Sequence, residues 1–306
     1  MKELISHMSA RMVYAIEYSA QASAQRTSDI TVSAKRGTIY DRNGNVLAMS
    51  VDATTIYANP AEITDAGATA QVLSEVLGGE ASDYLGALTR ENATFSYIKR
   101  KCDVDTADAL KARSTAYEQN GQGTSNPLTG IYYLSDSKRV YPYGEIGGQV
   151  IGYVGTEGQG LSGLELYYDD VLSGTDGELV YERGKGGIAV PGGVKTQVDA
   201  VDGQDIVVSI DINLQQTLEQ ALVENASSSG AAGAKGVVVD GATGEIYACA
   251  SLPLYDLSDV SSSEEGASTC KAISNAYEPG SCFKMVTAAA LLETGLASLD
   301  DTIEVP

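Results

Sequence analysis

Hydrophobic and polar positions in the first part of the chain predict strands interrupted by short helices. Two apolar runs, residues 37–40 and 46–48, flank an Asn-Gly pair, which predicts a two-residue hairpin with a type I′ turn. Tyrosine-rich runs at 130–134 and 139–143 predict two further strands. The spacing of apolar residues predicts helices at 11–25, 67–79, 81–88 and 106–112, and the run 120–127 is typical of a loop.

The second part of the chain combines strands with longer helices. Residues 205–210 predict a strand, and Asp211 is a good N-cap for the helix that follows. Runs 235–240 and 245–250 predict a hairpin, and the run 281–292 predicts a helix that begins after a Pro-Gly break. The helix after Asp211 is expected to bury one apolar face made of Leu214, Leu218, Ala221 and Leu222.

Composition limits the classes of protein to consider. The 306 residues are enough for about two domains, and hydrophobic residues at 43% with charged residues at 20% are typical of a folded chain. Asp and Glu outnumber Lys and Arg by 41 to 20, which gives a net charge of −21. Because such a surface repels phosphate backbones, nucleic-acid binding is not expected.

Several kinds of site are excluded by residue content. His7 is the only histidine, and the cysteines at 102, 249, 270 and 282 have no CxxC spacing. We therefore expect no zinc site, no histidine-based triad and no cofactor. The apolar runs are too short for a transmembrane helix, and the first residues do not resemble a signal peptide. A disulfide among Cys249, Cys270 and Cys282 is left open.

A Ser-x-x-Lys pair is the leading candidate for nucleophilic chemistry, ahead of Cys282, which is expected to be a packed side chain. On a helix, this spacing places the hydroxyl and the amine on one face, where a neutral lysine can accept the serine proton. The pattern occurs at Ser96/Lys99, Ser135/Lys138, Ser268/Lys271 and Ser281/Lys284. The first pair lies in a predicted strand, the second in a predicted turn and the third in a polar loop without a helix behind it. Only Ser281 precedes an apolar helix that a core could bury.

Sequence motifs in a fixed order resemble the class B penicillin-binding proteins. Residues 277–284, Tyr-Glu-Pro-Gly-Ser-Cys-Phe-Lys, resemble the active-site motif of penicillin-binding transpeptidases. Residues 36–48 resemble the opening signature of the pedestal, or dimerisation, domain of that family. Further stretches that are similar to the family follow in the same order, at 139–142, 160–165, 209–215 and 240–246.

The resemblance implies an α+β fold with two domains. Residues 1–33 are expected to form an N-terminal helix and linker that follow a missing membrane anchor. Residues 34–200 are expected to form a β-rich pedestal, and residues 201–306 the start of an α/β transpeptidase domain of the serine β-lactamase type. We expect that domain to be truncated after the Ser-x-x-Lys helix, so the sequence is interpreted as a fragment of a longer enzyme.

The pedestal residues of the resemblance imply structure rather than catalysis. Charged contacts are expected to hold the pedestal together and to orient it beneath the catalytic domain, and a glycine-rich hairpin with paired charges needs no ligand to explain it. The residues expected in this interdomain role are Arg36, Gly37, Asp41, Arg42, Gly44 and Glu165.

The function implied by the resemblance is peptidoglycan D,D-transpeptidation. Ser281 is expected to attack the D-Ala-D-Ala carbonyl of a stem peptide, with Lys284 as the base, and β-lactams are expected to acylate the same serine. The expected location is the outer face of the cell membrane. The expected protein partners are a membrane glycan polymerase and proteins of the division or elongation machinery.

Departures from the family pattern bear on activity. No Ser-x-Asn and no Lys-Thr-Gly or Lys-Ser-Gly follows Lys284, so the base lacks its second cation and half the pocket is absent. We therefore expect this chain alone to be inactive. Cys282 stands where the family commonly has Thr, and Cys270 where it commonly has Asn.

Two alternatives from other functional classes stay open. The chain could be a non-catalytic pedestal module that binds partners in cell-wall synthesis, which the severed second domain favours. It could also be a β-lactam sensor or β-lactamase, against which the pedestal signature at 36–48 argues.

Overall fold

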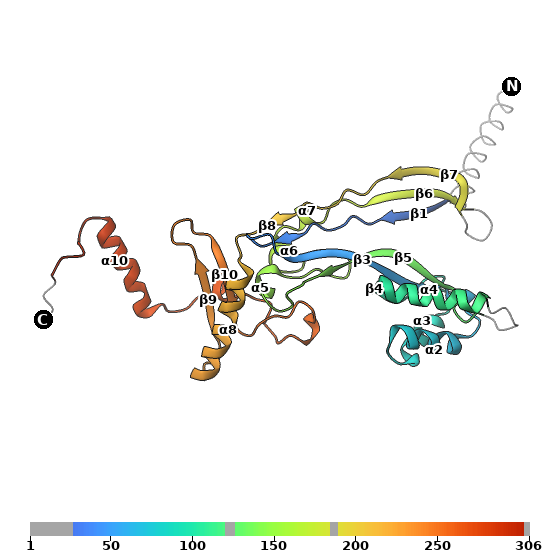
Figure 1. Cartoon of the computed structure of the whole chain (residues 1–306), viewed down its shortest axis with the longest axis horizontal. Helices are drawn as coiled ribbons and strands as arrows, with labels where there is room; N and C mark the ends of the chain where they lie inside the picture. The colour runs from blue at the N-terminus through green and yellow to red at the C-terminus, as the bar shows by residue number, and fades with distance from the viewer. Residues whose placement is uncertain (1–26, 120–125, 184–188, 303–306) are drawn as a thin grey trace, which may run out of the picture.

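The computed structural model describes residues 27–119, 126–183 and 189–302, which form an elongated molecule (Figure 1). Its spine is the long strand β3, which pairs with β2, β4 and β5 in antiparallel fashion. The strands of this sheet are β2 (Ile39–Tyr40), β3 (Val46–Ala58), β4 (Ser96–Asp103), β5 (Ile131–Val140) and β8 (Ile206–Val207), the last pairing in parallel with β2.

The hairpin between β2 and β3 forms as the sequence predicts, but its turn is of another type. The Gly44 N–H donates to the carbonyl of Asp41, and the Asp41 N–H donates to the carbonyl of Asn45. Gly44 has a φ of +85°, whereas Asn43 is not among the described residues with positive φ. A type I′ turn needs positive φ at both central residues, so that prediction was wrong and the loop is longer.

One end of β3 is covered by helices (Figure 1). Helices α2 and α4 contribute Leu73 and Leu110, both fully buried, to a hydrophobic cluster that also contains Ile56 of β3. The cluster holds this end of the pedestal together by apolar burial. The helices here are η1 (Pro60–Glu62), α2 (Ala66–Leu77), α3 (Ala81–Leu88) and α4 (Val104–Gln119). The predictions at 67–79 and 81–88 are confirmed, and the helix predicted at 106–112 is longer.

A second sheet runs beside the spine (Figure 1). Its antiparallel strands are β1 (Thr27–Val32), β6 (Gly177–Arg183) and β7 (Ala189–Val198), in the order β1-β6-β7. Short helices α5 (Gly148–Ile151), α6 (Gly163–Tyr167) and α7 (Asp169–Leu172) lie between β5 and β6 in the sequence.

The second part of the chain begins with a capped helix. Asp211 accepts hydrogen bonds from the N–H groups of Asn213 and Leu214, and Gly230 ends the helix in the left-handed conformation. The predicted hairpin is present as a two-stranded antiparallel sheet. The elements are α8 (Ile212–Ser229), β9 (Lys235–Val239), β10 (Ile246–Ser251), η2 (Val260–Ser262), α9 (Lys271–Ser274), η3 (Gly280–Phe283) and α10 (Lys284–Glu293).

Helix α8 buries only part of the apolar face that was predicted. Leu218 and Leu222 are half-buried, but Leu214 is 40% exposed, whereas Gln215 and Glu219 are almost fully buried. The reason is a polar contact: the Gln215 amide donates to the carbonyl of Cys249 and accepts from its N–H, both on β10. The Gln215 amide thus satisfies the backbone N–H and carbonyl of Cys249 in the way that a neighbouring strand would.

The tyrosine-rich region also differs from its prediction. Residues 130–134 and 139–143 were expected to form separate strands, but β5 runs unbroken and pairs with β3 from Ile131 to Val140. The pairing with β3 continues through the polar residues 135–138, so these do not end the strand. The helix predicted at 11–25 lies outside the described residues, as does most of the loop predicted at 120–127.

The two parts of the chain share a hydrophobic core. Ile39, Leu47 and Leu172 belong to the same buried cluster as Ile212 and Tyr255, so the second part is packed directly on the base of the first. Within the described ranges, no helix is long and apolar enough to cross a bilayer.

Candidate functional site

Ser281 and Lys284 lie at the junction of η3 and α10. The backbone N–H of Lys284 donates to the carbonyls of Ser281 and Cys282, so the serine stands in a tight turn directly before the helix. Both side chains are exposed, and no side-chain hydrogen bond joins the two residues, although both are described. The expected helix is therefore present, but the expected contact between nucleophile and base is not formed in this chain.

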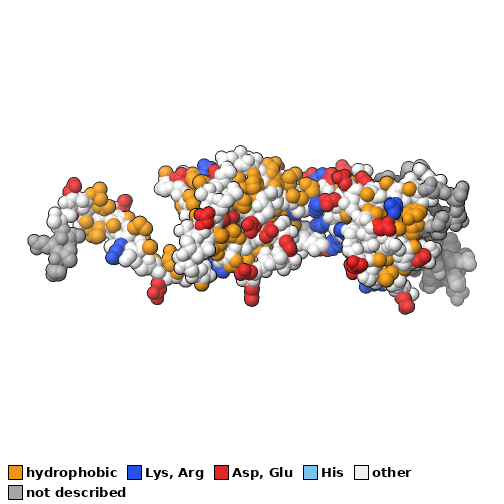
Figure 2. Space-filling model, turned by 60° about the horizontal axis from the view of Figure 1, so that its bottom comes forward, with side chains coloured by type: hydrophobic (Ala, Val, Ile, Leu, Met, Phe, Trp, Pro, Cys, Tyr) orange, Lys and Arg blue, Asp and Glu red, His pale blue; other side chains and the backbone are white. Residues whose placement is uncertain are grey.

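Helix α10 projects from the body of the molecule (Figure 1). We expected its apolar residues to be buried, and this was wrong for the chain as it stands: Met285 is 72% exposed and Val286 54%. The space-filling view shows hydrophobic side chains uncovered at the end of the molecule to which α10 belongs (Figure 2). The helix is rich in apolar residues, yet every residue of α10 is exposed.

The other Ser-x-x-Lys pairs do not form sites either. Ser96 and Lys99 lie on strand β4, as predicted. Ser135 lies on β5 and not in a turn, and residues three apart on a strand point to opposite faces. Lys271 begins the short helix α9, which the sequence did not predict.

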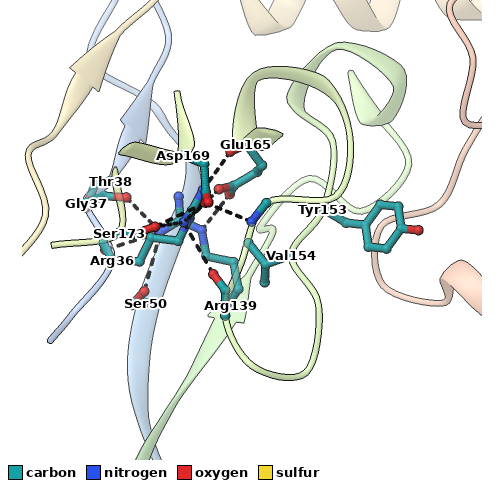
Figure 3. A network of polar contacts seen from close by, with 12 residues as sticks. Arg36, Gly37, Thr38, Ser50, Arg139, Tyr153, Val154, Glu165, Asp169 and Ser173 are labelled. Atoms are coloured by element: carbon teal, nitrogen blue, oxygen red, sulfur yellow. Dashed lines mark hydrogen bonds and ion pairs between the residues drawn. The ribbon is translucent and has the colours of Figure 1, made fainter. Parts of the chain in front are cut away.

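A buried cluster of charges lies at the base of the pedestal (Figure 3). Arg36 Nε lies 2.6 Å from Glu165 Oε2, and Arg139 Nε lies 2.7 Å from Glu165 Oε1. Arg36 also donates to the Glu165 carbonyl and to Asp169 Oδ1. We call Arg36, Arg139, Glu165 and Asp169 the arginine–carboxylate cluster. It ties the segment before β2, strand β5 and helices α6 and α7 to one point.

Burial sets the role of this cluster. Glu165 is fully buried and Arg36 is 8% exposed, so no substrate reaches the carboxylate in this structure. Burial raises the pKa of Asp169, but hydrogen bonds from the Gly160 N–H and from Arg36 outweigh it and hold that pKa below its usual value. The charges thus stabilise one another inside the pedestal.

Asp41 connects the pedestal hairpin to the second part of the chain. It is fully buried and accepts hydrogen bonds from Asn43, from Asn45 and from the N–H of Ile212 at the start of α8. Burial raises the pKa of Asp41, but the hydrogen bonds from Asn45, Asn43 and Ile212 lower it by more. The pKa of Asp41 is therefore below its usual value. Among the described residues Asp41 has no ion-pair partner, and its contacts there are hydrogen bonds.

Arg42 reaches across to the β9–β10 hairpin region. Its guanidinium lies 3.9 Å from the centre of the Tyr247 ring and 3.7 Å from Glu245, and its backbone N–H donates to the carbonyl of Ile210. Because Tyr247 and Glu245 belong to the β9–β10 hairpin region, Arg42 helps to fix the direction of that hairpin.

Two glycines are required for different reasons. A Cβ on Gly37 would lie 2.0 Å from the carbonyl oxygen of Gln204, so the two backbone segments touch only because there is no side chain. Gly44 has open space around it, but its positive φ favours glycine.

Several buried polar residues were missed by sequence reasoning. Arg139 and Asp169 complete the arginine–carboxylate cluster, yet only the stretch 139–142 was noticed. Gln149 is 8% exposed and donates to the carbonyls of Ser251 and Ala267. No local pattern identifies these residues, because important partners are distant in the sequence: Arg36 lies 133 residues before Asp169, and Ser251 lies 102 residues after Gln149.

Comparison with known families identifies two domains. The family model "Penicillin-binding Protein dimerisation domain" matches residues 31–208, and "Penicillin binding protein transpeptidase domain" matches residues 235–306.

In the described ranges, no three His, Cys, Asp or Glu side chains lie together as a metal ion would require.

Individual relatives agree with these matches. The chain is 32% identical to "Penicillin-binding protein PbpB" of Mycobacterium tuberculosis, over 94% of this chain and 43% of that protein. It is 31% identical to "Peptidoglycan D,D-transpeptidase FtsI" of Escherichia coli, over 87% and 44%. A peptidoglycan synthetase structure from Bifidobacterium adolescentis has a TM-score of 0.59 at 28% identity, over 92% of this chain and 53% of that one. The chain thus spans about half the length of the curated relatives it matches.

Proposed function

Since the chain belongs to the penicillin-binding protein family, we propose that it carries the pedestal and the acylation segment of a peptidoglycan D,D-transpeptidase. Ser281 is the nucleophile of this proposal and Lys284 the base. The observation that carries it is the position of Ser281 at the η3–α10 junction, within the segment matched by the transpeptidase family model.

The exposed face of α10 supports a requirement for further packing. Met285 and Val286 are largely uncovered, and a helix with such a surface gains stability when an apolar partner covers it. Covering this helix also removes water from Ser281 and Lys284. A lysine in such a site loses its proton more readily, particularly beside a second cation, and only then accepts the serine proton.

The proposed reaction is acyl transfer. The Ser281 hydroxyl attacks the carbonyl between the terminal D-alanines of a stem peptide and transfers its proton to Lys284. D-alanine leaves with a proton, and the amine of a neighbouring stem peptide then attacks the ester. The product is a cross-linked peptide and a free serine. A β-lactam acylates the same oxygen by opening its ring, so β-lactams are proposed ligands.

The pedestal is proposed to position this segment at the outer face of the cell membrane. Asp41 and Arg42 support this role, because one contacts the start of α8 and the other the β9–β10 hairpin region. Partners in cell-wall synthesis, such as a glycan polymerase, are proposed for the far end of the pedestal. There the rings of Phe95 and Tyr97 are 40% and 49% exposed and stack edge to face.

Labelling with a fluorescent penicillin tests the proposal. Two proteins are compared: the 306-residue chain, and the same chain extended in cis with the remainder of the transpeptidase domain of the E. coli relative. We expect an adduct on the extended protein alone. Trypsin releases residues 272–284 as one peptide, which contains both Ser281 and Cys282, so the mass of this peptide does not show which of the two carries the adduct. Variants decide between them: Ser281→Ala must abolish the adduct, and Cys282→Ala must retain it.

Circular dichroism and thermal melting establish that the extended protein is folded before labelling. A folded extended protein without an adduct would contradict the proposed function. An adduct that survives Ser281→Ala would contradict the assignment of the nucleophile.

A further inference from the structure

Two cysteine thiols lie in contact a short distance before Ser281 in the sequence. Cys249 is on β10 and is 1% exposed, and Cys270 immediately precedes α9 and is partly exposed. Both are free thiols, and their sulfur atoms lie 3.3 Å apart. The sulfurs of a disulfide are about 2.05 Å apart, so an approach of little more than an ångström allows a bond.

Neighbouring contacts hold the two cysteines in place. The backbone N–H of Cys249 donates to Gln215 Oε1 at 2.8 Å. On the other side, the N–H of Lys271 donates to Ser251 Oγ at 2.9 Å, and Lys271 Nζ donates to the carbonyl of Leu252 at 3.1 Å. The start of α9 is thus fixed to the end of β10, and the juxtaposition of the sulfurs follows from this packing.

The surroundings give the two thiols different reactivity. The hydrogen bond between the two thiols lowers the pKa of Cys270, and the N–H groups of Ala272 and Ile273 add to this effect against the influence of burial. The same hydrogen bond, together with burial, raises the pKa of Cys249. Because a thiolate is the attacking species in disulfide exchange, the partly exposed Cys270 is the first to react and the buried Cys249 the second.

We propose that Cys249 and Cys270 are a modification site, where the two thiols form a reversible intramolecular disulfide by exchange with an external disulfide. The external disulfide is that of a small thiol or of a dithiol protein. The Cys270 thiolate attacks one sulfur of the external disulfide, forms a mixed disulfide and releases the first thiolate. Cys249 then loses its proton and attacks Cys270 Sγ, which forms the internal bond and releases the second thiolate. Overall, the two cysteines are oxidised by two electrons and the external disulfide is reduced to two thiols.

The bond would fix the approach to the acylation segment. It closes the loop between residues 249 and 270 and joins α9 covalently to β10. Residues 275–279 lead directly from α9 to Ser281, so the bond restricts the position from which η3 and α10 start. The proposal rests on the two thiols and is independent of the proposed transpeptidase function.

Oxidised glutathione is the probe for the test, applied to the folded 306-residue chain and followed by alkylation and mass spectrometry. Trypsin leaves both cysteines in the peptide 236–271, so a second cleavage after Glu264 or Glu265 separates them. We expect the two fragments to remain joined, with the mass of two hydrogen atoms missing, and to separate on reduction. The exposed Cys282 reports in the same sample whether exchange with glutathione took place.

Variants separate this bond from other thiol chemistry. Cys282→Ser, the matched control, should retain the bond, and Cys270→Ser should abolish it. The oxidised wild type should melt at a higher temperature than the reduced wild type, because the bond constrains the unfolded chain, and Cys270→Ser should show no such difference. Recovery of Cys249 and Cys270 as separately alkylated thiols, while Cys282 carries glutathione, would overturn the proposal. A bond from Cys282 to either of them would overturn it as well.

Discussion

Replacement of Glu165 by glutamine tests whether the arginine–carboxylate cluster holds the pedestal together. The carboxylate receives Arg36 Nε at 2.6 Å and Arg139 Nε at 2.7 Å and is fully buried. Glutamine has the same shape but no charge, and its amide N–H groups would face one of the guanidinium groups. Arg36 then keeps only the carboxylate of Asp169, which is partly exposed, and Arg139 loses the carboxylate with which it pairs.

The expected loss for Glu165→Gln is that of breaking a buried ion pair, about 3–5 kcal/mol. This is a large part of the roughly 5–15 kcal/mol that stabilises a typical protein, and it corresponds to a shift of about 1–2 M in the urea midpoint. Urea unfolding followed by circular dichroism measures this shift, and an unchanged slope shows that the same unfolding reaction is compared.

Glu157→Gln is the matched control for this experiment. Glu157 Oε1 lies 2.7 Å from Arg100 Nη1, almost the same distance as in the cluster, but the Glu157 side chain is 71% exposed. Exposed pairs contribute little, so its midpoint should not move. Equal shifts for Glu165→Gln and Glu157→Gln would refute the conclusion that burial makes the cluster important.

Three further substitutions test other parts of the interface between pedestal and second segment. Gly37→Ala places a Cβ 2.0 Å from the Gln204 carbonyl oxygen, and it should lower the free energy of unfolding, measured in urea, by roughly 1–3 kcal/mol. Gly241→Ala is the control, because nothing lies within 4 Å of the added atom, and its loss should be far smaller. Similar losses for the two variants would contradict a close approach at Gly37. Burial raises the pKa of Glu219, so its charged form is disfavoured on folding and wild-type stability should fall as the pH rises from about 4.3 through the folded pKa. Glu219→Gln removes this fall and should be at least as stable as wild type at neutral pH, and a steeper fall in the variant would contradict the assignment. The pKa of Asp41 is lowered on folding, so its effect on stability runs in the opposite direction with pH. The excess of the wild-type free energy of unfolding over that of Asp41→Asn should be complete above about pH 4 and disappear as the pH falls through the folded pKa. An excess that does not depend on pH would show that the charge of Asp41 is not involved.

Local patterns predicted the elements whose signals lie close together in the sequence. The helix α8 follows from its cap Asp211 and its end at Gly230, and the β9–β10 hairpin follows from two apolar runs around a turn. The turn after Asp41 was assigned to the wrong type, because an Asn-Gly pair suits either a two-residue turn or a longer loop in which only Gly44 has positive φ.

Long-range polar contacts could not be predicted in the same way. Gln215 pairs with the backbone of Cys249, so α8 buries this polar side chain beside the apolar residues that were expected to face the sheet. Arg139 joins Glu165 only after β5 has paired with β3 in register. Resemblance to a family indicated Arg36 and Glu165, but their geometry became visible only in the folded chain.

The central claim is that Ser281 is a nucleophile that reacts only when further packing covers α10. Penicillin labelling of the 306-residue chain and of its extended form, in parallel, tests this claim most directly. The adduct is read by intact mass and located in peptide 272–284. The account predicts an adduct at Ser281 in the extended protein and none in the 306-residue chain. A stoichiometric adduct on the 306-residue chain that is lost in Ser281→Ala would contradict it, since Ser281 would then be activated without any further packing on α10.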